Sequence, residues 1–140
     1  MNGEIIRRRA RVSPEERRIL DGDRRIDRAL YMDGSRDVIS GEKLLERGKL
    51  IAIRPHTRFI AFPEHTHDYV EMVYMCCGAT THCINGERLR LESGELLMLG
   101  QNARQSIEAA GEGDIAVNFI VRPAFFTSTL PLLGDRKSGV

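Results

Sequence analysis

Two long-range signals are missing from this chain: an apolar stretch long enough to cross a membrane, and a large net charge. No window approaches the roughly 20 consecutive apolar residues of a transmembrane helix, and the N-terminus is too charged for a secretory signal peptide. The formal net charge is +1, so no overall electrostatic field indicates a nucleic acid or an acidic partner. We therefore expect a cytoplasmic protein with no membrane partner.

Cysteine is also scarce, with three residues in the whole chain. They are Cys76, Cys77 and Cys83, an odd number whose spacing is not that of a zinc knuckle. Neighbouring residues of a strand face opposite sides, so Cys76 and Cys77 could not easily form a disulfide with each other. We expect reduced thiols that pack as small hydrophobic groups.

The composition that is present is that of one globular domain. The chain has 140 residues, of which 41% are hydrophobic, and a chain of this length buries roughly two thirds of its unfolded surface. Its first fifty residues differ from the rest, because they are rich in charge and lack the alternation of strands. An arginine-rich arm over residues 1–12 could contact DNA phosphates, but the acidic residues that soon follow favour a solvated tail.

Two helices are predicted after this arm. Ser13 supplies a hydroxyl cap, Pro14 occupies the first helical position, and Glu16 is placed to complete a capping box. Gly22 interrupts the apolar stripe of this first helix. Ser40 is expected to cap a second, short helix through Lys43, Leu44, Leu45 and Glu46, which Gly48 ends.

From residue 50 onward the apolar period changes from helical to two, which is typical of strands. Asn85-Gly86 is the strongest turn signal, because both residues tolerate the positive backbone angles of a tight hairpin. The last strand is apolar on both faces and should be covered on both. Many short strands at this spacing favour a sandwich or a closed barrel. The predicted strands are 50–53, 58–62, 69–77, 80–84, 87–91, 95–99, 104–109 and 114–122.

The most informative stretch is PEHTHDYVEMVYMCCG, residues 63–78. His65, His67 and Glu71 share one parity, so an extended segment would place all three on the same face of a sheet. Two imidazoles and a carboxylate can hold Fe, Zn, Mn or Ni and leave positions open for a substrate or water. The same parity continues through Val73 and Met75 to Cys77, which indicates an apolar cavity wall beside the polar cluster.

This stretch resembles the first sequence motif of the cupins, His-x-His, three residues, Glu, six residues, Gly, and matches it at every spacing through Gly78. The second cupin motif is matched at Gly94, but Gln105 stands where the fourth metal ligand, a histidine, is expected. The longer run from about residue 50 to 126 is similar to the N-terminal sensor domain of AraC-type transcription regulators. It carries FPEHTHDYVEMVYMCCG, HCINGERLRLESGELLML and DIAVNFIVRPAFF in the same order.

The resemblance implies a mainly β fold, a cupin double-stranded β-helix or jelly-roll barrel, with N-terminal helices and a short C-terminal helix. Residues 1–49 would form the arm and two helices packed on the barrel, and residues 50–126 the barrel itself. Residues 127–140 would form a helical segment or linker towards a DNA-binding domain outside this chain.

The candidate site follows from the motif and the resemblance. We expect His65, His67, Glu71, Val73 and Gln105 to bind a small-molecule effector, and the same set without Val73 to be the candidate metal ligands. If these groups bind no metal, they would form hydrogen bonds to an organic effector.

Three residues near the candidate site have weaker claims. His82 could reach it, although a lone histidine near a hairpin is more often exposed or hydrogen-bonded, and His56 is expected in a loop. Of Arg104 and Gln105, which lie on opposite faces, the resemblance favours Gln105 as the inward one.

Two functions from different classes remain open at this point. The first is the effector-binding and dimerisation domain of an AraC-type regulator, a homodimer that reaches DNA only through another domain. The second is a small metal-dependent cupin enzyme, such as a dioxygenase, isomerase or decarboxylase. The missing fourth histidine favours the regulator, so we expect no catalytic residues.

Overall fold

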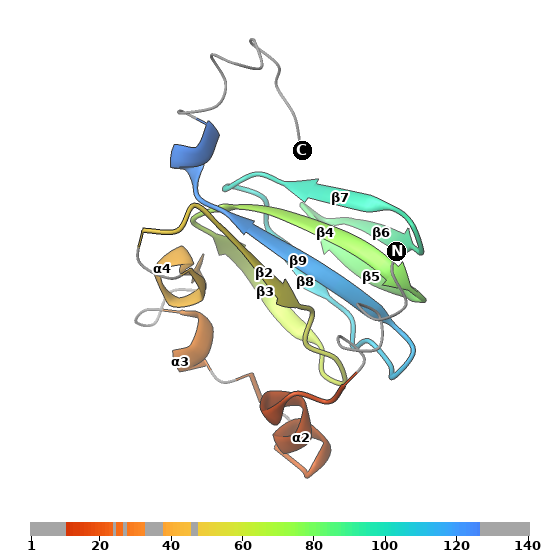
Figure 1. Ribbon diagram of the computed structural model, residues 1–140. Helices are drawn as coiled ribbons and strands as arrows, with labels where there is room; N and C mark the ends of the chain where they lie inside the picture. The colour runs from red at the N-terminus through yellow and green to blue at the C-terminus, as the bar shows by residue number, and fades with distance from the viewer. Residues whose placement is uncertain (1–10, 24, 27, 33–37, 46–47, 127–140) are drawn as a thin grey trace.

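Two packed β-sheets make up most of the molecule (Figure 1). The computed structural model describes residues 11–126, except 24, 27, 33–37 and 46–47. One sheet has five strands in the order β1-β3-β8-β5-β6, and the other has four in the order β2-β9-β4-β7. Side chains from the two inner faces fill the space between the sheets, which confirms the mainly β jelly roll of the cupin type that the sequence predicted.

The strands are short and nearly all antiparallel. The one parallel pairing among the described strands joins β1 to β3. The five-stranded sheet contains β1 (Val38–Ile39), β3 (Phe62–His67), β8 (Gln105–Ile107), β5 (Ala79–Ile84) and β6 (Glu87–Glu92). The four-stranded sheet contains β2 (Ile51–Pro55), β9 (Ile115–Val121), β4 (Val70–Cys77) and β7 (Leu96–Leu99).

The first helix, α2, begins as predicted. Ser13 and Glu16 form a reciprocal capping box, and Pro14 opens the helix, which runs over Pro14–Leu20. Gly22, with φ +122°, follows the end of the helix, because a left-handed backbone angle cannot continue a right-handed helix. A separate short helix, α3 (Arg28–Tyr31), comes next.

The helix after residue 40 differs from its prediction. Helix α4 is a single turn, Gly41–Leu44, and the Ser40 side chain makes no capping hydrogen bond. Instead the backbone N–H of Gly41 donates to Asp68 Oδ1 at 2.6 Å, so a carboxylate from the β3–β4 connection caps the helix. At the other end of the described chain, residues 123–126 form one helical turn. No described helix has the length and apolar character needed to span a membrane.

Helices α3 and α4 close one side of the space between the sheets. Tyr31 of α3 and Leu44 of α4 belong to the same buried cluster as Phe62 and Ile107 of the five-stranded sheet and Ile120 of the other. Figure 1 shows both helices at the side of the molecule where β2 of one sheet and β3 of the other lie. The helices therefore complete the core at this side.

Three local predictions about the strands were tested. The Asn85-Gly86 hairpin is confirmed, with φ +49° and +87°. The prediction of a strand over residues 58–62 was wrong: Phe59 has φ +78°, and the strand instead starts at Phe62 and includes Pro63. The inward parity of β4 also fails at Cys77, because a register shift between Met75 and Cys77 places Cys77 opposite Ile115. Cys77 therefore packs with the cluster of Cys76, Ile115 and Val117, and not with the inner cluster of Val73 and Met75.

The outer face of the four-stranded sheet is apolar. Ile53, Phe119, Met72 and Met98 stand in one row across β2, β9, β4 and β7. The next row holds Val117, Tyr74 and Leu96. Ile53 and Leu96 remain 51% and 52% exposed, and none of the described helices lies over this face in Figure 1. The prediction that β9 is covered on both faces agrees with its burial: Val117 and Val121 of the outer face are 5% and 1% exposed, and Ile120 of the inner face is 2% exposed.

Candidate functional site

The cupin-like motif occupies two strands that belong to different sheets. His65 and His67 lie on β3 of the five-stranded sheet, and Glu71 lies on β4 of the four-stranded sheet. The expectation of one extended strand with a single parity was therefore wrong, because residues 68 and 69 turn the chain from one sheet to the other. The three side chains nevertheless meet, since both strands present them to the space between the sheets, and all three are buried.

His67 and Glu71 form a buried charged pair. His67 Nε2 lies 3.1 Å from Glu71 Oε2, although the ring nitrogen is out of line for a well-directed hydrogen bond. Burial lowers the pKa of His67, but the interaction with Glu71 outweighs burial and the net pKa is raised. Burial likewise raises the pKa of Glu71, and His67 reverses this to a net lowering. The two directions agree on an imidazolium next to a carboxylate.

A chain of polar side chains continues from Glu71 into the five-stranded sheet. Gln105 Nε2 donates to Glu71 Oε2 at 3.5 Å, and Gln105 Oε1 is 3.1 Å from His82 Nδ1. Because an amide oxygen only accepts, this His82 nitrogen carries the proton. The other ring nitrogen then accepts from the hydroxyl of Thr80 at 2.8 Å. Burial lowers the pKa of His82, so its ring is neutral.

This chain decides two of the sequence alternatives. Gln105 faces inward and is buried, while Arg104 lies on the surface and pairs with Glu64 at 2.6 Å. His82 is completely buried and hydrogen-bonded, so it belongs to the interior cluster that the sequence left uncertain. The predicted ligand residue Val73 lies in the apolar cluster with Met75 and Leu99.

A cavity lies between the sheets beside His65 and Glu71. Its volume is about 50 Å³, which is room for roughly four water molecules. Its apolar walls come from both sheets and from α3 and α4: Tyr31, Ile39, Leu44, Phe62, Tyr69, Ile107 and Ile120. Its polar lining consists of Arg54, His56, Thr57, His65, Glu71 and Asn118. An apolar cavity with a few convergent polar groups is the usual form of a small-molecule site.

Two polar atoms at this cavity are buried without a partner in the described structure: His56 Nε2 and Asn118 Oδ1. Burial and the nearby His82 lower the pKa of His56 to about 4, against the opposing effect of Glu71, so the His56 ring is neutral. An unpaired buried polar group costs about 1–3 kcal/mol. The cost would be relieved by a ligand that bonds to these atoms.

Sequence reasoning did not include His56, Asn118 and Arg54 in the site. His56 was expected in a loop, and it does follow the end of β2, but it is buried there. Asn118 offered one signal, since it is the single polar residue within β9, and a polar residue on the inner face of an apolar strand needs a partner.

The motif residues were also considered as metal ligands. His65 Nδ1 lies 2.7 Å from the carbonyl oxygen of Pro63, and His67 Nδ1 lies 3.0 Å from that of Tyr69. Both contacts place a proton on Nδ1, and metal-binding histidines commonly have such a second contact. The donor chemistry therefore fits a metal. The arrangement does not yet fit, because within the described ranges no three His, Cys, Asp or Glu side chains are grouped to hold one ion.

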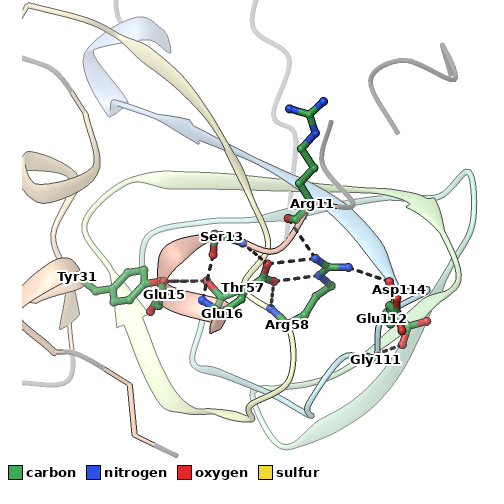
Figure 2. A network of polar contacts seen from close by, with 10 residues as sticks. All are labelled: Arg11, Ser13, Glu15, Glu16, Tyr31, Thr57, Arg58, Gly111, Glu112 and Asp114. Atoms are coloured by element: carbon green, nitrogen blue, oxygen red, sulfur yellow. Dashed lines mark hydrogen bonds and ion pairs between the residues drawn. The ribbon is translucent and has the colours of Figure 1, made fainter. Parts of the chain in front are cut away.

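A second polar network anchors α2 to residues 57 and 58 (Figure 2). Arg58 is 1% exposed, and its Nε donates to Glu16 Oε2 at 2.9 Å while its backbone N–H donates to the same oxygen at 2.7 Å. Beside it, the hydroxyl of Tyr31 contacts both Glu15 and Thr57. Residues 56–58 thus connect the cavity wall to the N-terminal helices.

The two packed sheets of the jelly roll and the polar cavity between them place the chain in the cupin fold class. The model of one family, the AraC-like ligand binding domain, matches residues 47–139. This is more than half of the chain, and the protein belongs to that family.

Two relatives of this chain are transcription activators. The HTH-type transcriptional activators RhaS of Pectobacterium carotovorum and Pectobacterium atrosepticum are each 36% identical to this chain over 76 residues. The matched part covers 54% of this chain and 27% of each activator. The chain therefore spans about a quarter of the length of these relatives.

Part of the chain is similar to solved structures at low TM-scores. KdgF from Halomonas has a TM-score of 0.46 and 16% identity, over 51% of this chain and 69% of its own. A cupin protein from Bacteroides fragilis has a TM-score of 0.41 and 20% identity, over 64% of this chain and 70% of its own. Likeness at this level concerns the fold alone.

Proposed function

We propose that this chain is the effector-binding and dimerisation module of an AraC-type transcription regulator, a protein of the cytoplasm. The effector-binding part of this proposal is supported by the internal cavity, where His56 Nε2 and Asn118 Oδ1 are buried without a partner in the described structure. A small molecule that bonds to these atoms would convert a cost of folding into binding energy. DNA binding would come from a domain outside this chain, as the activator relatives suggest.

A test of effector binding compares two variants with the same kind of change. Ile120 lines the cavity, so Ile120→Phe should fill it, whereas Leu89→Phe enlarges an exposed side chain on β6, away from the cavity lining. A library of small metabolites is screened by thermal shift on the natural protein. A true effector raises the melting temperature of the natural protein and of Leu89→Phe but leaves Ile120→Phe unchanged. Equal shifts in all three proteins would reject the cavity as the binding site.

The dimerisation half of the proposal is supported by the outer face of the four-stranded sheet. Its two rows, Ile53-Phe119-Met72-Met98 and Val117-Tyr74-Leu96, contain no charged residue. A second copy of the same face is the partner we propose, because a two-fold contact between identical sheet faces brings apolar side chains together and buries no unpaired charge. Exposed apolar patches of this kind mark interaction sites.

Sedimentation velocity tests this contact. Ile53→Lys should convert a dimer to a monomer, since a charge would be buried within the contact. Leu89→Lys is the matched control, because Leu89 is also an exposed aliphatic residue, 40% exposed, but lies on β6 of the other sheet. A monomeric natural protein, or equal dissociation by both variants, would contradict the proposed interface.

The metal-dependent cupin enzyme is the second proposal. Its one supporting distance is the 3.1 Å between His67 Nε2 and Glu71 Oε2, since two ligands bonded to one zinc ion at about 2.0–2.2 Å can stand about 3 Å apart. A third ligand is missing among the described residues, so no reaction step is derived from it. Elemental mass spectrometry of the purified protein, with His65→Ala as control, tests it: the enzyme proposal requires near-stoichiometric metal that the variant loses.

A further inference from the structure

One wall of the cavity carries three polar groups from β2, its extension and β9. Arg54 and Asn118 are paired in register on adjacent strands. His56 follows Arg54 by two residues, and its backbone N–H donates to the carbonyl oxygen of Ala116 at 3.1 Å, which continues the β2–β9 pairing. All three side chains line the cavity.

Each of these groups has unused bonding capacity. His56 Nε2 and Asn118 Oδ1 are buried and unpartnered. Arg54 is half-buried and forms no ion pair with any described residue. Other arginines behave differently: Arg58 is paired with Glu16, and Arg104 is paired with Glu64. A guanidinium that lines a cavity and has no carboxylate partner from the described part of the chain calls for an acid from elsewhere.

We propose that the effector is a small monocarboxylic acid, whose carboxylate is bound by Arg54, His56 and Asn118 and whose apolar body contacts the aromatic wall opposite. This inference rests on the proposed effector-binding function. A guanidinium binds a carboxylate through two parallel N–H donors. The neutral His56 ring donates from Nε2 in one of its two tautomers, and rotation of the Asn118 amide exchanges its oxygen for a donating NH₂ group.

The rest of the cavity agrees with an acid of this kind. Glu71 is an anion in the same cavity, but His67 lies 3.1 Å from its Oε2 and compensates its charge, so Glu71 does not cancel the attraction of Arg54. Phe62, on β3 of the facing sheet, supplies an aromatic surface to the lining. The cavity volume of about 50 Å³ limits the apolar body to a short chain.

The test uses matched acids and amides that differ in charge but hardly in shape: propionate and propionamide, and butyrate and butyramide. Binding of each to the full chain is measured by isothermal titration calorimetry. The acid of at least one pair should bind at least tenfold more tightly than its amide. Arg54→Gln should weaken that acid by about 10- to 100-fold, since hydrogen bonds between charged groups contribute about 1.5–3 kcal/mol.

Two further variants control for charge and for folding. Arg54→Lys keeps the positive charge but loses the two parallel N–H donors of the guanidinium, so its affinity for the acid should lie between those of the natural protein and Arg54→Gln. Arg104→Gln removes a surface arginine and should leave the affinity unchanged. Melting temperatures of all variants establish that each is folded.

The outcomes separate this inference from the function on which it rests. If amides bind as tightly as acids, or if Arg54→Gln leaves acid binding intact, the inference is overturned and the effector pocket stands. If Ile120→Phe fails to block any ligand that binds, the pocket itself is wrong. If no acid in the panel binds, the inference is likewise overturned, and the broader metabolite screen decides the effector function.

Discussion

The buried ion pair between Glu16 and Arg58 should control how firmly the N-terminal helix is attached to the barrel. The Glu16 carboxylate accepts from Arg58 Nε at 2.9 Å, from Arg58 Nη2 at 3.1 Å and from the Arg58 backbone N–H at 2.7 Å. It also accepts from the backbone N–H of Ser13 at 3.0 Å. Glu16→Gln removes the charge and one of the two accepting oxygens, and leaves a buried guanidinium without its counter-ion.

The expected magnitude follows from that unpaired charge. Removing one partner of a buried pair costs about 3–5 kcal/mol, although Arg58 keeps a hydrogen bond to the carbonyl oxygen of Glu112 at 2.8 Å. We therefore expect the free energy of unfolding to fall by about 3 kcal/mol, a large part of the roughly 5–15 kcal/mol of a typical domain. For a chain of this size the melting temperature should fall by about 10 °C.

Urea denaturation followed by circular dichroism measures this loss, and Glu15→Gln is the matched control. Glu15 lies next to Glu16 on the same helix, but it accepts hydrogen bonds from the uncharged hydroxyl groups of Tyr31 and Thr57. Its loss should cost about 1 kcal/mol. Equal effects of the two substitutions would refute the argument that the buried charge makes Glu16 special.

The same pair predicts a dependence on pH. Burial raises the pKa of Glu16, but hydrogen bonds from Arg58 and Ser13 outweigh burial and hold it below its ordinary value of 4.5. A carboxylate whose pKa is lowered by folding stabilises the fold above its unfolded pKa, and this contribution is lost as pH falls through the folded value. The difference in stability between the natural protein and Glu16→Gln should therefore be constant from neutral pH to about 4.5 and shrink below it. A difference that grows on acidification would contradict the assignment.

Four further substitutions, one of them a control, test other parts of the structure. Gly78→Ala should lower the free energy of unfolding, measured by urea titration, by about 2–3 kcal/mol. The reason is that Gly78 has φ +71° and an added Cβ would lie 2.8 Å from the Gly113 carbonyl oxygen. Gly94→Ala is the control: Gly94 has φ +88° but nothing lies within 4 Å of an added Cβ, so the loss should be only about 1 kcal/mol. Asp68→Ala removes the acceptor that caps α4 and should cost about 1 kcal/mol in the same assay. Gln105→His adds an imidazole within reach of Glu71 and should raise zinc retention, measured by elemental mass spectrometry; unchanged retention would argue against a metal centre there.

Features that depend on a few neighbouring residues were predictable from sequence. The capping box of Ser13 and Glu16 and the Asn85-Gly86 hairpin are such features, because backbone angles and short-range hydrogen bonds decide them. The inward orientation of Gln105 was also predicted, through the resemblance to cupins. Its position 3.5 Å from Glu71 agrees with the place that the motif gives it.

Features that depend on where the chain changes direction were not predictable. Parity counting assumed one strand through His65, His67 and Glu71, but the turn at residues 68–69 moves Glu71 to the other sheet. The bulge after Met75 reverses the parity of Cys77 in the same way. Neither turn nor bulge contains a glycine or proline that would have marked it.

The polar wall of the cavity could not be found by any pattern along the chain. His56 and Asn118 are 62 residues apart in the numbering, and they come together only because β2 pairs with β9. Pairing partners of this kind are chosen by the whole sheet, and one-residue shifts would send Asn118 to the outer face. The residues that carry the effector hypothesis are therefore a product of tertiary structure.

The cavity and the N-terminal helix share one short segment, residues 56–58. His56 lines the cavity, Thr57 contacts Tyr31, and Arg58 holds Glu16 of α2. A ligand that bonds to His56 therefore acts on the same backbone that attaches α2. Coupling free energy between two equilibria is reciprocal. If ligand binding strengthens the attachment of α2 to residues 56–58, then weakening that attachment by Glu16→Gln should lower the ligand affinity by the same factor. If the proposed effector binds in the cavity, this segment would transmit its binding to α2.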